Sequence, residues 1–66
     1  MVKIMSITVE KFIDSLRPTM QINIVDGEGN VLTSFMKVAY KAQYSDSEIK
    51  DINYEGEDRL SVMVGN

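Results

Sequence analysis

Apolar residues follow two different spacings along this chain, first a helical one and later a strand-like one. Between Val9 and Leu16 they recur every three or four positions (VEKFIDSL), which places them on one face of a helix. Thr8 is a favourable N-cap, because its hydroxyl can accept a hydrogen bond from the first turn. Pro18 restricts the residue before it and ends the helical pattern. We therefore expect a helix over residues 8–17, whose apolar stripe packs against another element.

Strict alternation of apolar and polar residues predicts strands in the rest of the chain. Residues 20–25 read MQINIV, which puts glutamine and asparagine on the face opposite to methionine and isoleucine. The turn-forming stretch DGEGN follows at 26–30, and VLTSF at 31–35 forms the second arm of a hairpin. Residues 60–64 (LSVMV) alternate in the same way and follow the turn-forming EGED, which predicts a final strand.

The middle of the chain fits more than one interpretation. Residues 36–44 have an apolar residue at every even position, as in a strand, but their composition also suits a helix. A serine and a glutamate at capping-box spacing would start a short helix over 46–52. We prefer a turn at 45–48 and a strand from about 49 to 55, because the final strand needs a neighbour to pair with.

Together these elements predict a single small α+β domain over residues 1–66. One N-terminal helix would pack on a small, mostly antiparallel sheet of about four strands. The chain has no cysteine and no histidine, so neither a disulfide nor an ordinary zinc site can supplement its small core. A chain of this size then depends on close packing or on a second chain, and a homodimer is one expectation.

The stretch DGEGN could also be a ligand-binding loop, but its surroundings argue against that. Asp26, Glu28 and Asn30 stand at the first, third and fifth positions of a calcium loop. The sixth position, where that loop needs glycine, is Val31, and the twelfth, where it needs glutamate, is Lys37. Two acids in the loop would also repel a phosphate group. We expect only a bend between two strands, with no metal and no cofactor.

Catalytic chemistry has little support in the composition. Six serines are present, but without histidine none of them has the usual general base. A catalytic pair of carboxylates needs one desolvated member, whereas the acids here lie mostly in expected turns and on polar strand faces. A chain this short also leaves little material to enclose a pocket. We expect a protein that is not an enzyme.

Charge is distributed unevenly along the chain. Residues 1–41 hold four acids and five bases, a balance of +1, whereas residues 42–66 hold six acids and two bases, a balance of −4, and the net charge is −3. This distribution argues against direct nucleic-acid binding and favours another protein with a basic surface as the partner. Tyrosines interleave with these acids, and tyrosine is enriched at protein interfaces. The expected partner-binding residues are Tyr44, Asp46, Glu48, Asp51, Tyr54, Glu55, Glu57 and Asp58.

Two other interpretations of these surfaces stay open. Tyr40 and Tyr54 can equally be ordinary core or cross-strand residues. A small open sheet also exposes two edges, and pairing there would make the protein a self-associating structural subunit. Lys37 and Lys41 could be charges that protect one of those edges. No apolar run approaches the length of a membrane span, so we expect a cytoplasmic protein without a membrane partner.

The order of three segments, ITVEKFIDSL, INIVDGEGNVL and EIKDINYEGEDRLSVMV, resembles small orphan proteins carried by phages and mobile elements of Gram-positive bacteria. The resemblance lies in the pattern of a short capped helix, a hairpin with an acidic, glycine-containing turn, and a closing hairpin. It implies a small intracellular accessory protein that acts on a host or phage macromolecule. A phage-type inhibitor that occupies the basic site of a host nucleic-acid-binding or defence enzyme is therefore the second functional expectation.

Overall fold

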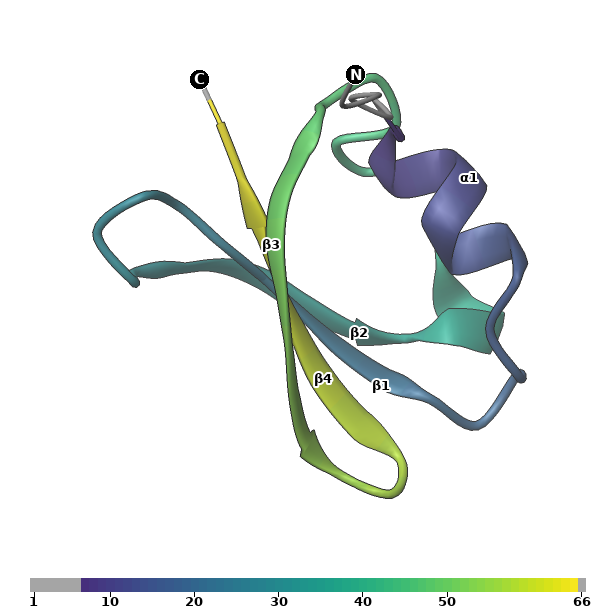
Figure 1. Ribbon diagram of the computed structural model, residues 1–66. Coiled ribbons are helices and arrows are strands. Elements are labelled where there is room, and N and C mark those ends of the chain that lie inside the picture. Colours follow the sequence, from purple (N-terminus) through teal and green to yellow (C-terminus); the bar gives the residue numbers. More distant parts are fainter. Residues whose placement is uncertain (1–6, 66) are drawn as a thin grey trace, which may run out of the picture.

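The computed structural model describes residues 7–65 and contains one short helix and four strands. Its α+β class agrees with the prediction (Figure 1). No helix within residues 7–65 is long and apolar enough to cross a membrane. The elements in chain order are α1 (Val9–Asp14), β1 (Gln21–Val25), β2 (Val31–Met36), the 3₁₀ helix η1 (Lys37–Ala39), β3 (Ile49–Gly56) and β4 (Arg59–Val64).

The four strands form one mixed sheet in the order β2-β1-β4-β3. Both hairpins are antiparallel, but the two central strands, β1 and β4, run parallel. Two of the three strand pairings are antiparallel, in agreement with the predicted mostly antiparallel sheet. The prediction did not specify the parallel pairing of β1 with β4, because nothing local in the sequence indicates a pairing between strands so far apart. The sheet is strongly twisted, so that β2 and β3 cross at a wide angle in Figure 1.

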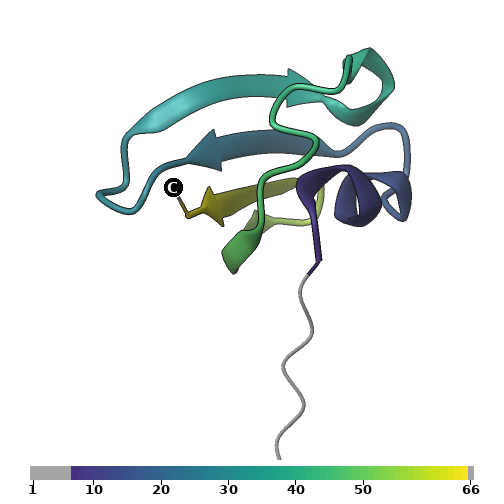
Figure 2. The ribbon, with the colours of Figure 1, turned by 90° about the horizontal axis from the view of Figure 1, so that it is seen from above.

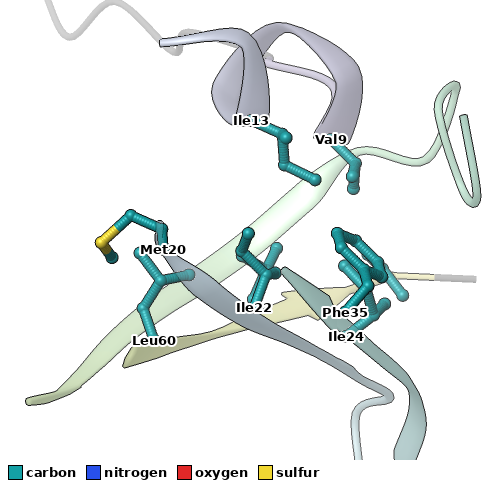
Figure 3. Packing of buried hydrophobic residues seen from close by; sticks show 9 residues of the cluster. Val9, Ile13, Met20, Ile22, Ile24, Phe35 and Leu60 are labelled. Atoms are coloured by element: carbon teal, nitrogen blue, oxygen red, sulfur yellow. The ribbon is translucent and has the colours of Figure 1, made fainter. Parts of the chain in front are cut away.

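The core lies between α1 and one face of the sheet. Val9 and Ile13 point from the helix toward Ile22 and Phe35 on the strands below (Figure 3). The predicted apolar stripe is therefore confirmed, with Phe12 and Leu16 half-buried at its margin. The buried cluster comprises Val9, Ile13, Met20, Ile22, Ile24, Phe35, Leu60, Val62 and Val64.

The N-terminus of α1 is capped partly by a distant loop. Thr8 is the N-cap, as predicted, and its side chain accepts a hydrogen bond of 3.4 Å from the backbone N–H of Lys11. Two earlier N–H groups donate to loop carbonyls, from Val9 to Ser47 at 3.0 Å and from Glu10 to Ser45 at 3.3 Å. The loop thus satisfies amides that a helix leaves without intrahelical partners.

The helix ends at Asp14, so the predicted boundary at residue 17 is wrong. The reason is a tighter last turn before Pro18. The N–H groups of Ser15 and Leu16 donate to carbonyls only three residues back, and the Ser15 hydroxyl donates to the Phe12 carbonyl at 2.7 Å. These bonds replace the next helical turn and turn the chain toward β1.

Residues 36–44 form neither the strand nor the regular helix that the sequence allowed. Residues 37–39 form η1, and turns lead from there to β3, so residues 36–44 are mostly not regular structure. The preferred turn and strand are confirmed, because β3 begins at Ile49, and the alternative helix over 46–52 is wrong. Ala42 and Tyr44 both have positive φ angles, 66° and 57°, which non-glycine residues rarely adopt.

Candidate binding surface

The two faces of the sheet differ in chemistry. The face under α1 is apolar, whereas no helix of the part described, residues 7–65, packs on the opposite face (Figure 1). Seen from the helix side, α1 lies over the end of the sheet where β1 begins, and the β1–β2 turn extends beyond it (Figure 2). We call the uncovered side the open face.

A row of uncharged polar side chains crosses the open face through all four strands. In the strand register, Ser34 lies opposite Asn23, Asn23 opposite Ser61, and Ser61 opposite Asn53. The Ser34 hydroxyl donates to the Asn23 Oδ1 at 2.6 Å, and the Gln21 Nε2 donates to the Ser34 hydroxyl at 3.1 Å. We call Ser34, Asn23, Ser61 and Asn53 the polar row.

Carboxylates line the β3 side of the open face. Glu55 accepts a hydrogen bond of 2.7 Å from the Ser61 hydroxyl, which joins the carboxylates to the polar row. Asp58, in the β3–β4 turn, accepts from the Arg17 guanidinium at 2.7 and 3.0 Å. In this exposed ion pair Arg17 neutralises the charge of Asp58, and the pair contributes at most about 1 kcal/mol to stability.

The open face has two shallow hollows that are wide open to solvent. A broad hollow of about 900 Å³ and a smaller one of about 280 Å³ share Glu55 as a lining residue. Around the larger one, three carboxylates and one guanidinium surround uncharged polar groups, so the hollow is polar and carries excess negative charge. Its lining residues are Thr19, Gln21, Asn23, Ser34, Glu55, Gly56, Glu57, Asp58 and Arg59.

The structure divides the predicted partner-binding residues between three places. Asp51 and Glu55 on β3 and Glu57 and Asp58 in the turn after it line the hollows of the open face. Tyr54 pairs with Leu60 and so lies on the opposite face, because successive strand residues alternate sides. The remaining three, Tyr44, Asp46 and Glu48, lie in or beside the loop that caps α1.

The three tyrosines therefore have separate environments. Tyr40 packs on the core, with its ring centroid 5.2 Å from that of Phe35, and its hydroxyl donates to the Gln43 carbonyl at 3.0 Å. Burial raises the pKa of the Tyr40 hydroxyl, and the nearby carboxylates of Glu10 and Asp46 raise it further. The core interpretation holds for Tyr40, whereas Tyr54 is 64% exposed.

In the acidic turn between β1 and β2, the Asp26 carboxylate accepts hydrogen bonds from other residues of the same turn. Asp26 Oδ1 accepts from the N–H groups of Glu28 and Asn30, each at 2.9 Å, and Oδ2 accepts from the Asn30 amide at 3.3 Å. These bonds, first the one from Asn30 and then that from Glu28, lower the pKa of the Asp26 carboxyl. Gly29 takes a φ of +87°. The predicted hairpin turn is confirmed, and within residues 7–65 no group of three potential metal ligands is found.

The polar row was not anticipated as a unit, although part of its signal is visible in the sequence. Asn23, Asn53 and Ser61 occupy the polar positions of alternating segments. Their alignment depends on the parallel pairing of β1 with β4, which alternation alone does not reveal. Comparison of the chain with protein-family models, with curated proteins and with solved structures found no match, so the geometry alone supports the functional argument.

Proposed function

We propose that this protein is a non-catalytic binding protein whose open face accepts a basic surface of a partner protein. The observation that supports this proposal is the polar row beside Asp51, Glu55, Glu57 and Asp58. Its two ends, Ser34 and Asn53, are exposed, Asn23 is half-buried, and Ser61 is buried and donates to Glu55. Such a face combines hydrogen-bonding groups with an excess of negative charge, and both are features of specific interfaces.

The two parts of the face have different tasks in this proposal. The amides of Asn23 and Asn53 and the hydroxyl of Ser34 can form hydrogen bonds with polar groups of the partner, which favours one orientation. The carboxylates attract lysine and arginine side chains from a distance and increase the association rate. Arg17 already balances Asp58, and Arg59 adds a second positive charge to the larger hollow. The excess negative charge that attracts the partner therefore comes from Asp51, Glu55 and Glu57.

A charge reversal at Glu57 tests the proposal. Its side chain lines the larger hollow, and Glu57→Lys adds a positive charge where the partner is expected to be positive. Asp14→Lys is the matched control, because it makes the same change in net charge on an exposed residue of α1. We expect affinity for a partner captured from the native cytoplasm to fall about tenfold in Glu57→Lys, or about 1.4 kcal/mol, and to stay unchanged in Asp14→Lys.

The salt dependence of the same binding provides a second measurement. Exposed charges interact weakly beyond about 8 Å at physiological ionic strength, so affinity should fall steadily as sodium chloride is raised. Equal loss of affinity in Glu57→Lys and Asp14→Lys, or binding that does not respond to salt, would overturn the proposed site.

A further inference from the structure

The outer edge of β2 differs from the rest of the surface. β2 is an end strand of the sheet, and none of its six residues is charged. Of the six large hydrophobic side chains exposed within residues 7–65, four lie in the segment from β2 to η1: Val31, Leu32, Met36 and Val38. An uncharged edge strand with apolar side chains is a template for pairing with another strand.

Along this edge, backbone groups of β2 point outward, and no strand within residues 7–65 pairs with them. The N–H of Lys37 donates to the carbonyl of Met20 at 2.7 Å, next to the register pair of Gln21 and Met36. In an antiparallel ladder the residues that face the partner strand alternate with those that face away. Met36 and Ser34 therefore direct their N–H and C=O groups away from β1.

The opposite edge of the sheet has the features that prevent pairing. β3 carries Lys50, Asp51 and Glu55, and its register with β4 shifts at two places. Charges and bulges on an edge strand discourage contact with another edge. β2 also has one register shift, at Leu32, so the two edges differ chiefly in charge. On the β2 side, the lysines expected to protect an edge do not belong to the strand, because Lys37 lies in η1 and Lys41 in the loop after it.

We propose that β2 pairs antiparallel with β2 of a second copy of this chain, around a two-fold axis at Ser34. In this register Ser34 faces its own counterpart on the open face, and Leu32, the extra residue at the register shift of β2, lies opposite Met36. On the other face Thr33 lies opposite Phe35. A β2 edge joined to β3 of the next copy would instead repeat without closing.

The occupant is a second copy because the edge is complementary to itself. None of the residues Val31–Met36 carries a charge that would select a foreign strand. The central serine pair has the same neighbours on both sides, first a Thr33–Phe35 pair and then a Leu32–Met36 pair. A chain of 66 residues without cysteine also gains needed stability from self-association. The dimer would join two four-stranded sheets and extend the polar row through both copies.

Two lysine substitutions on opposite edges test the interface. Ser34 and Asn53 are both exposed and end the same polar row, on β2 and β3 respectively. By light scattering we expect the wild type and Asn53→Lys to have twice the 7.5 kDa mass of the chain, and Ser34→Lys to be a folded monomer by circular dichroism. A wild type that stays monomeric at millimolar concentration, or a dimer that persists in Ser34→Lys, would overturn the proposal.

Cysteine cross-linking tests the register. The chain contains no cysteine, so Ser34→Cys introduces one thiol. Residues in a hydrogen-bonded antiparallel pair have Cα atoms about 5.5 Å apart, within the range of about 4.4–6.8 Å that a disulfide spans. We expect mild oxidation to convert Ser34→Cys into covalent dimers and to leave Asn53→Cys mostly uncoupled. Equal yields from the two variants would show random collision and would contradict the two-fold axis at Ser34.

Discussion

At the scale of single residues, Asp26 resembles a calcium ligand in the sequence but stabilises a turn in the structure. Its carboxylate accepts three hydrogen bonds from Glu28 and Asn30, so its oxygens already close the turn. We expect Asp26→Ala to lower the melting temperature, because the N–H groups of the turn lose their acceptor. Glu28→Ala, which keeps the donating backbone N–H, is the matched control and should melt like the wild type.

The pH dependence of the Asp26 effect follows from its lowered pKa. A carboxyl with a lower pKa in the folded state than in the unfolded state adds stability above the unfolded value, about 3.9 for aspartate. This contribution is lost as the pH falls through the folded pKa. The difference in melting temperature between wild type and Asp26→Ala should therefore shrink as thermal unfolding is measured at successively more acidic pH. A difference that grows on acidification would mean that the charged carboxylate does not stabilise the turn.

Ala42, unlike Asp26, has a side chain that destabilises the local backbone conformation. A φ of 66° brings the Cβ atom close to the following carbonyl, which costs about 1–2 kcal/mol for a residue other than glycine. We expect Ala42→Gly to raise the free energy of unfolding in urea by about 0.5–1 kcal/mol after the entropy cost of glycine is included. Ala39→Gly in η1 should instead lower it, because the φ of Ala39 is not positive.

At the scale of elements, α1 depends on its packing more than on its own length. Six residues are too few for a stable isolated helix, and Val9 and Ile13 are its two buried anchors. Ile13→Val should lower the free energy of unfolding by about 1 kcal/mol, and Ile13→Ala by about 2–5 kcal/mol. Asp14→Ala, on the exposed side, should change it by less than about 0.5 kcal/mol. Denaturant melts of the three variants provide the comparison.

The elements were predictable from the sequence where the signal is local. The apolar spacing of α1, its N-cap Thr8 and the alternation in β1 and β4 each involve neighbours in the chain, and the structure agrees with them. The turn at 45–48 was predicted, but the position of the loop between η1 and β3 against α1 was not, because contacts with a distant helix end determine it. Its carbonyls at Ser45 and Ser47 accept from the first turn of α1, and no pattern within the loop indicates that.

At the scale of the whole molecule, the burial of each strand explains the order of the sheet. β1 and β4 supply five of the buried side chains, namely Ile22, Ile24, Leu60, Val62 and Val64, and a strand with two neighbours buries its apolar residues best. This argument favours β1 and β4 as the central pair without giving their relative direction. The polar row depends on that direction, so the candidate surface could be predicted only as an acidic half of the chain.

Hydrogen exchange connects the order of the strands with the proposed dimer. Amides of β1 and β4 should exchange most slowly, because both strands have neighbours on each side and fully buried side chains. α1 should open at lower free energy than the central strands, since only two buried residues anchor it.

The exchange rate of the Ser34 N–H shows whether β2 is an edge strand in solution. This N–H points outward and should exchange quickly in a monomer but slowly in the dimer, whereas Ser34→Lys should leave β1 and β4 protected and speed exchange in β2. A dimer in which the Ser34 amide still exchanges quickly would have to use another surface.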